Sequence, residues 1–223
     1  MNAYKIKNYF REKRLLKRQK YYQKRILNPP DDITLISSNC LGGIIYHDLG
    51  KQFLSPTINL TFDENDYLCF CENLKSLPSS TLTEDLNNNH PYPVGLLSVP
   101  GLNNPLRIYF VHYQTFEEAK RSFERRSKRI NTDKILLLFS VLDLDFASAN
   151  RFAKIHSYKK LCFYKTNVDN CFLPNRSDCK FIRIRGKIPK NKDMLSFKNI
   201  LGRKMFIDDT PFDYHAYLFK NND

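Results

Sequence analysis

The chain has 223 residues, of which 42% are hydrophobic and 26% are charged. A chain of this size and composition buries a sizeable core and is not a disordered protein, so we expect one main domain. No apolar run approaches the roughly 20 residues of a membrane-spanning helix, and the N-terminus lacks the apolar stretch of a secretory signal. We therefore expect a cytoplasmic protein whose six cysteines are free thiols and which holds no structural zinc.

The net charge of +13 is concentrated at the N-terminus. Residues 1–28 contain ten Lys and Arg side chains against one acidic residue, Glu12, and their apolar residues recur near helical spacing. Asn28-Pro29-Pro30 ends the predicted helix. We therefore divide the chain into a basic amphipathic segment, 1–28, and a single α/β domain, 30–223. We expect that the segment can be removed without unfolding the domain.

Three roles are open for the basic segment. It could lie on the anionic inner face of a membrane, where lysines are attracted and apolar side chains enter the interface. It could pack its apolar stripe on the domain and leave its charges in solvent. It could also bind nucleic-acid phosphates, but the rest of the sequence contains no nucleic-acid-binding motif, which makes nucleic acid an unlikely partner.

The remainder alternates predicted strands and helices. Helix signals include Thr115-Phe-Glu-Glu118, a capping box, and the continuous apolar run 135–142 is typical of a central parallel strand. We predict a three-layer α/β/α fold with a mixed, mostly parallel sheet. The expected strands are 33–39, 57–62, 94–99, 106–113, 135–142, 161–165 and 181–185. The expected helices are 44–49, 64–77, 115–130, 147–156, 194–205 and 213–219, and 79–91 is an expected surface loop.

The densest motif runs from Ser37 to His47. A buried strand brings Ser38, Asn39 and Cys40 to the carboxyl edge of the sheet, where ligands of open α/β sheets bind. The following Gly42 and Gly43 let backbone amides approach a ligand closely. Cys40 near a helix N-terminus is a candidate nucleophile, with His47 or His112 as its base. In the alternative, the glycines form a structural turn and Cys40 is a small buried side chain.

Two further groups could serve a site. Arg121, Arg125 and Arg129 are spaced by four residues on one helix, and guanidinium groups bind phosphate or acidic sugars. On spacing alone they could equally form ion pairs on a solvated helix. Asp143 and Asp145 follow the central strand and could hold a divalent metal, Mg²⁺ or Mn²⁺, or could instead cap the next helix.

Several of these stretches together carry a resemblance: 36–50, 53–59, Tyr92-Pro-Val-Gly95, His112-Tyr113 and the helix 117–131. Over residues 30–219 the chain resembles a family of bacterial proteins often described as exopolysaccharide or capsule biosynthesis proteins. The resemblance implies a three-layer α/β fold and a role in such a pathway, but no particular reaction. The family's usual aromatic residue after the Cys is Leu41 here, and its second Asn is Ser38.

We therefore expect a transferase of exopolysaccharide or capsule assembly that acts on a phosphate-bearing sugar donor or lipid-linked acceptor. His112 would be the general base, Cys40 would point to acyl transfer, and Asp143 with Asp145 would point to metal-dependent glycosyl transfer. The alternative is a non-catalytic protein that binds the membrane surface or partners of an assembly complex. The residues we assign to substrate or phosphate are Ser38, Asn39, Gly42, Gly43, Tyr46, Tyr113, Arg121, Arg125, Arg129 and Asn131.

Overall fold

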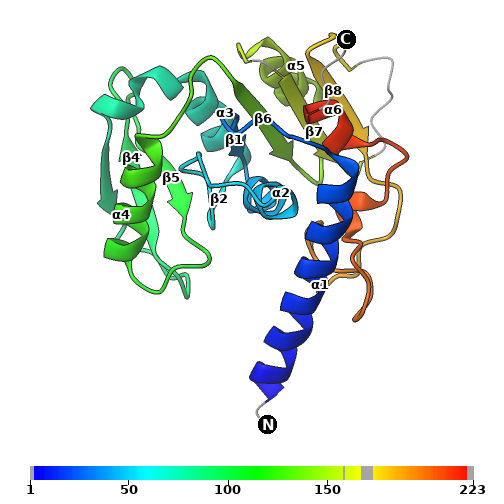
Figure 1. Cartoon of the computed structure of the whole chain (residues 1–223). Coiled ribbons are helices and arrows are strands. Elements are labelled where there is room, and N and C mark those ends of the chain that lie inside the picture. Colours follow the sequence, from blue (N-terminus) through cyan, green and yellow to red (C-terminus); the bar gives the residue numbers. More distant parts are fainter. Residues whose placement is uncertain (1–2, 158, 167–172, 220–223) are drawn as a thin grey trace.

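The computed structural model describes residues 3–157, 159–166 and 173–219. Its helices and strands alternate along much of the chain, which confirms the α/β class (Figure 1). The α-helices are α1 (Ala3–Arg25), α2 (Leu41–Leu49), α3 (Glu64–Glu72), α4 (Phe116–Ser127), α5 (Phe146–Lys154) and α6 (Tyr214–Phe219). Short 3₁₀ helices are η1 (Leu74–Ser79) and η3 (Phe206–Asp208).

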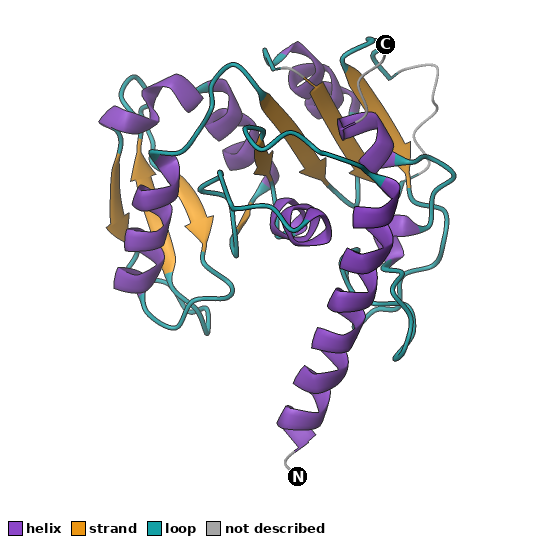
Figure 2. Ribbon diagram, in the orientation of Figure 1, coloured by secondary structure: helices purple, strands orange, loops and turns teal. Residues whose placement is uncertain are grey.

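Sheet A is entirely parallel. Its strand order is β1-β6-β7-β8, with bounds β1 (Thr34–Ser37), β6 (Ile135–Ser140), β7 (Lys159–Tyr164) and β8 (Cys179–Arg183). β6 lies in the interior of the sheet, as its apolar run predicts, and Ile135 to Phe139 are all buried. One face packs on α3, α5 and sheet B, and the other on α1, α2 and α6, so sheet A lies between two covering layers (Figure 2).

Sheet B is entirely antiparallel, which differs from the single mixed sheet we expected. Its order is β2-β5-β4-β3, with bounds β2 (Thr61–Phe62), β5 (Leu106–Tyr109), β4 (Val94–Ser98) and β3 (Thr81–Glu84). α4 covers it through the buried side chains of Phe116, Ala119 and Phe123. Gly95 fits closely here, because an added Cβ would lie 2.8 Å from Leu82 Cδ1 and 2.9 Å from Phe110 Cε2, so that these side chains would have to shift.

The two sheets meet at the carboxyl end of β1. The carbonyl oxygen of Ser38 accepts hydrogen bonds from the Phe62 amide at 3.0 Å and from Thr61 Oγ1 at 3.1 Å, both in β2. On its other side, Ser38 Oγ accepts from the Ser140 amide at 2.9 Å, at the end of β6. The end of β1 is thus held between both sheets, which makes the loop that follows it a rigid place for a site.

Two expected elements are wrong. Residues 81–84 of the expected loop form β3, and the expected helix 194–205 is absent. In its place the chain turns back on itself, with a bridge between Phe197 and Met205 and a hydrogen bond from the Lys198 amide to the Lys204 carbonyl at 3.0 Å. Gly202 lies inside this turn, where its high entropy cost disfavours a helix.

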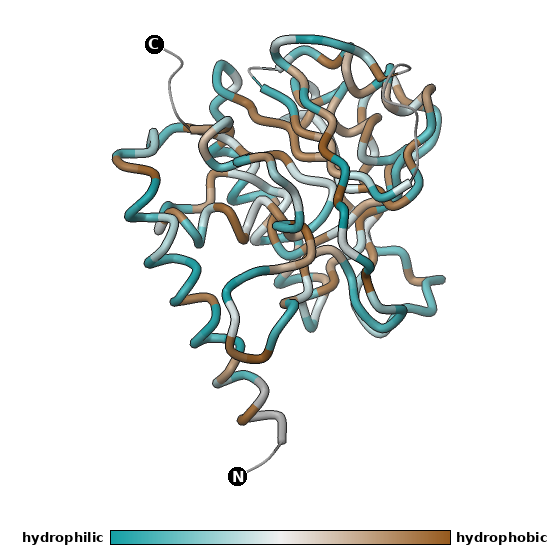
Figure 3. The backbone as a smooth tube through the Cα atoms, turned by 90° about the vertical axis from the view of Figure 1, so that its right-hand side faces the viewer, coloured by the Kyte–Doolittle hydropathy of each residue, from teal (hydrophilic) through white to brown (hydrophobic). Residues whose placement is uncertain are grey.

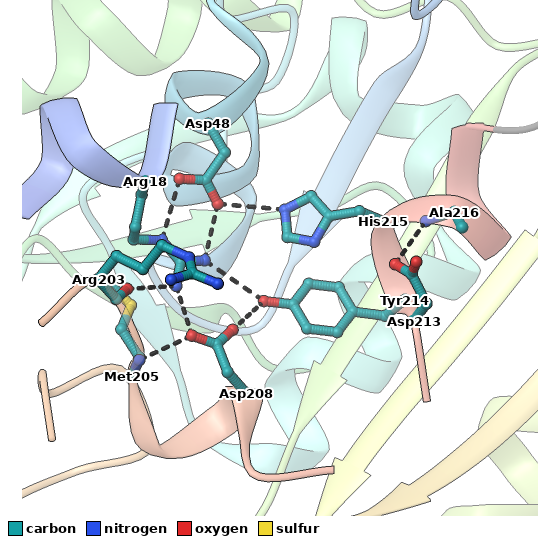
Figure 4. A network of polar contacts seen from close by, with 9 residues as sticks. All are labelled: Arg18, Asp48, Arg203, Met205, Asp208, Asp213, Tyr214, His215 and Ala216. Atoms are coloured by element: carbon teal, nitrogen blue, oxygen red, sulfur yellow. Dashed lines mark hydrogen bonds and ion pairs between the residues drawn. The ribbon is translucent and has the colours of Figure 1, made fainter. Parts of the chain in front are cut away.

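α1 packs on the domain through one face, and that face contains a buried ion network (Figure 4). Arg18 is 0% exposed and donates from Nε and Nη2 to the two carboxylate oxygens of Asp48 in α2, at 3.0 and 2.7 Å. Its Nη1 pairs with Asp208 and donates to the Arg203 carbonyl at 3.1 Å. His215 Nε2 lies 3.1 Å from Asp48, and the Tyr214 hydroxyl donates to Asp208 at 2.7 Å.

This packing changes the expectation for residues 1–28. Burial alone would lower the pKa of Arg18, but Tyr214, Asp48 and Asp208 raise it above its ordinary value, so the guanidinium stays charged. Removing the segment would leave the buried Asp48 without its cation, and we no longer expect the domain to tolerate that loss. Among the described residues, no helix is long and apolar enough to cross a bilayer.

Candidate functional site

The loop between β1 and α2 forms the centre of the candidate site. Asn39 Oδ1 accepts a hydrogen bond from the Leu41 amide at 3.0 Å and so fixes the entry into α2. α2 begins at Leu41, so Gly42 and Gly43 lie in its first turn rather than in a turn before it. An added Cβ at Gly42 would lie 3.2 Å from Ser37 Cβ, and this glycine lets α2 pack closely against β1.

Cys40 precedes the helix and is mostly covered. Its Sγ lies 3.8 Å from the Leu60 carbonyl, just before β2. Burial, together with the negative charge of Asp193, raises the pKa of the Cys40 thiol to about 11, although Arg11 acts in the opposite direction. The side chain is therefore a neutral thiol at neutral pH, which favours the alternative of a packing residue over an activated nucleophile.

His112 lies on the same side of the molecule as Cys40. β2 connects the two, because Leu60 contacts Cys40 while the next residue, Thr61, pairs with Tyr109 of β5, and His112 follows three residues later. His112 is exposed, yet the protein around it displaces part of its water. This desolvation and the charge of Arg11 lower the pKa of His112, while Asp193 acts to raise it. A neutral imidazole of this kind can accept a proton.

Arg11 and Asp193 are site residues that the sequence did not reveal. Each acts on the pKa values of both Cys40 and His112, so the two charges are close enough to affect both groups electrostatically. Arg11 comes from α1 and Asp193 from the segment before η3, where Ser196 Oγ donates to the Asp193 carboxylate at 2.8 Å. No sequence signal separates Arg11 from its basic neighbours, because its charge acts on Cys40 and His112 only through the packing of α1 on the domain.

One polar atom at this edge has no partner. Ser140 Oγ is buried and makes no hydrogen bond within the described part of the chain. Ser140 ends β6 beside Ser38, at the junction of the two sheets. Buried hydroxyls are normally paired, so the atom could donate to or accept from a group that enters the site.

Other predicted residues hold the fold together. The Tyr46 hydroxyl donates to the Ile33 carbonyl at 2.8 Å and accepts from the Leu35 amide at 2.9 Å. Asn131 lies at the amino end of β1, the edge opposite the site, and its Nδ2 donates to the Asp32 carbonyl at 3.0 Å. The buried Tyr113 accepts at its hydroxyl from Arg126 at 2.7 Å. Tyr46 and Asn131 therefore do not face the candidate site.

The predicted arginine face is divided. Arg121 and Arg125 are exposed on α4, and no contact in the structure connects them to the β1–α2 loop. Arg129 donates to the Phe53 carbonyl at 3.4 Å, and Arg126 of the same basic stretch lies over the Phe53 ring. The helix thus contacts the segment after α2, not the loop before it, and the structure does not bring these arginines together with Cys40 and His112.

The predicted metal ligands have a structural explanation. Asp145 caps α5, because its Oδ1 accepts from the Ser148 amide at 2.7 Å and its Oδ2 from Ser148 Oγ at 3.2 Å. Asp143 is exposed in the preceding turn. No group of three or more His, Cys, Asp or Glu side chains able to hold a metal ion occurs among the described residues. Helix capping, the alternative we kept open, accounts for Asp145.

A groove of about 580 Å³ lies next to His112 in the chain and was missed by the sequence analysis. Its walls are the connection from β3 to β4 and the start of α4. The His90 and Tyr92 rings stack there with centroids 5.1 Å apart, and Glu84 and Glu117 supply carboxylates. None of the described residues that line it is Lys or Arg. His90 close to Tyr92 was the sequence signal that could have indicated this groove.

Residues 7–218 match a protein-family model described as a domain of unknown function, DUF1919. The chain belongs to this family. A Haemophilus influenzae protein described as uncharacterized is 32% identical to the DUF1919 chain over 130 residues, which is 57% of this chain. The chain spans 60% of the length of that relative. The family match includes α1 from residue 7, so the buried Arg18 lies within the DUF1919 domain.

The environment of Cys40 predicts its reactivity in the DUF1919 domain. With a pKa of about 11, the fraction of thiolate at neutral pH is roughly 100-fold or more below that of an ordinary cysteine with a pKa of about 8.5. Iodoacetamide should therefore modify Cys40 far more slowly than a cysteine in an unfolded peptide. Mass spectrometry of the native protein measures this rate. Rapid alkylation at Cys40 would contradict the prediction and support the hypothesis that Cys40 is a nucleophile.

Proposed function

We propose that the protein is a transferase of exopolysaccharide or capsule assembly that acts on a phosphate-bearing sugar at the carboxyl edge of sheet A. The observation that carries the proposal is that the charge of Arg11 acts on both His112 and Cys40, the residue that precedes α2. Arg11 supplies a cation for a phosphate, and the amides of Gly42 and Gly43, in the first turn of α2, add donors at the positive end of the helix dipole. His112 supplies a base for an acceptor hydroxyl.

The groove supports a sugar as the other part of the substrate. Aromatic rings at His90 and Tyr92 can pack against the apolar face of a sugar ring, and the carboxylates of Glu84 and Glu117 can accept from its hydroxyls. His112 lies two residues before Gln114, which lines the groove. We propose that a sugar in the groove extends toward His112, which is near the groove in the chain, and that its phosphate extends toward Arg11.

Glycosyl transfer is the better-supported reaction. Acyl transfer through Cys40 requires a thiolate, and the raised pKa of Cys40 disfavours one. Glycosyl transfer needs no covalent enzyme intermediate if His112 accepts the proton of the attacking hydroxyl while the donor's phosphate leaves. The proton passes to the imidazole, the new C–O bond forms at the anomeric carbon, and the bond to the phosphate oxygen breaks.

The test is a panel of nucleotide sugars and acyl donors offered to the full-length protein, with and without Mg²⁺ or Mn²⁺. We expect turnover of at least one nucleotide sugar, and mass spectrometry of the released nucleoside phosphate measures this turnover. Arg11→Gln should weaken binding of the corresponding nucleoside diphosphate by about 10-fold, because one charge-assisted contact is lost. Lys24→Gln, an exposed position on α1, is the matched control. Equal affinities of the two variants, or no turnover of any donor, would contradict the proposal.

A further inference from the structure

α1 has a second face that the fold leaves in solvent. While Leu15, Arg18 and Ile26 face the domain, residues spaced by three and four on the other side are exposed. Apolar members of this outer face are Tyr9 and Leu16, with 53% and 48% of their surface exposed, and Leu27, just beyond the end of α1, is 78% exposed. Its basic members are Lys13, Lys17, Lys20 and Lys24.

A second exposed apolar group lies beside this face. Ile200 and Leu201, at the tip of the turn between Phe197 and Met205, are 69% and 67% exposed. Arg14 donates to the Ile200 carbonyl at 3.3 Å and Lys17 to the Leu201 carbonyl at 3.4 Å. The tip is therefore held against α1 at the edge of the outer face, although the two segments are far apart in sequence.

The arrangement is visible along the backbone. α1 projects beyond the carboxyl edge of sheet A (Figure 1), and in Figure 3 the helix alternates hydrophilic and hydrophobic segments next to the hydrophobic turn. The buried pairs of Arg18 with Asp48 and Asp208 fix the rotation of the helix. The same pairs thus determine that the lysines and the exposed apolar side chains face away from the domain.

We infer that the outer face of α1 and the Ile200–Leu201 tip form one docking surface for a bilayer that contains anionic lipids. Lysines at the level of the headgroups are attracted to anionic lipids by about 1 kcal/mol each, while apolar and aromatic side chains enter the interface. Nucleic-acid phosphates would be matched by the lysines alone and would give no reason for Leu16, Leu27, Ile200 and Leu201 to be exposed. The inference does not depend on the proposed transferase activity.

The test measures sedimentation of the full-length protein with vesicles of phosphatidylcholine, with and without phosphatidylglycerol. Anionic vesicles should bind the protein, and a variant with Lys13→Gln, Lys20→Gln and Lys24→Gln should bind roughly 100-fold more weakly. Lys17 is left intact because it contacts the tip. The matched control changes three exposed lysines elsewhere, Lys75→Gln, Lys128→Gln and Lys154→Gln, and should bind almost as the unchanged protein does.

A second variant tests the apolar part. The double variant Ile200→Gln, Leu201→Gln should weaken vesicle binding without a change in charge. Because both side chains are exposed, the variant should fold normally, and circular dichroism verifies its folding. Equal loss in the two lysine variants would show attraction by net charge alone and overturn the inference. Unchanged vesicle binding by the tip variant would also overturn it. If double-stranded DNA displaces the protein from vesicles, and does so equally well for the tip variant, the surface binds nucleic acid instead.

Discussion

Replacing Arg18 with Met is expected to lower the free energy of unfolding by about 3–5 kcal/mol, because it leaves a buried carboxylate without its cation. Asp48 is 0% exposed, and after the change only His215 would remain within contact of it. Asp208 would keep its bonds from Tyr214 and the Met205 amide. Since domains are stable by only about 5–15 kcal/mol, the loss should be plain in urea denaturation followed by circular dichroism.

Two further variants separate the network from the helix. Lys24→Met makes the same kind of change at an exposed position of α1, and its midpoint should be close to that of the unchanged protein. Adding Asp48→Asn to Arg18→Met should recover part of the stability, because it removes the unpaired buried charge. If Arg18→Met is as stable as Lys24→Met, the network contributes little and α1 is held by its apolar contacts.

Replacing His112 with Gln is expected to lower the turnover of the nucleotide sugar found in the donor panel by roughly 10²–10⁴-fold. Gln keeps the approximate size of the side chain but cannot accept the proton. In the unchanged protein the rate should fall on acidification, because protonation removes the base. Desolvation and Arg11 lower the pKa of His112, so the midpoint of this fall should lie below about 6.5, the value of a free histidine.

The control is His156→Gln, an exposed histidine after α5 at the amino edge of sheet A, which should leave turnover unchanged. Arg11→Gln tests whether His112 acts as the base or has only a structural role, because a structural role would not make the pH dependence of the rate sensitive to the charge of Arg11. Removing its positive charge should move the acid midpoint of the rate toward higher pH. A pH profile that is the same with and without His112 would exclude it as the base.

The parts of the fold that could be predicted are those fixed by local signals. The continuous apolar run placed β6 inside a sheet, and Thr115 accepts from the Glu118 amide at 3.3 Å, as the capping motif predicts. β3 escaped prediction because only Leu82 of its four residues is buried, so its pattern resembles a polar loop. The burial of Arg18 could not be predicted, since its partners Asp48 and Asp208 lie 30 and 190 residues away.

The candidate site was only partly predictable for the same reason. The carboxyl end of β1 and His112 follow from where strands end, which is a local property. Arg11 and Asp193 reach the region only through the packing of α1 and of the segment before η3. Tyr46 and Asn131 belong to the motifs that carry the resemblance, yet they hold β1 in place. A motif alone does not separate residues that bind a ligand from residues that position the backbone.

The contact between Arg18 and Asp208 has a consequence for the order in which the chain folds. α1 is synthesised before η3 and α6, which complete the network. Until residue 208 has emerged, the arginine has no second carboxylate, and α1 cannot take its final position on the domain. The final attachment of the basic helix to the domain therefore requires that the chain has been made at least as far as residue 208.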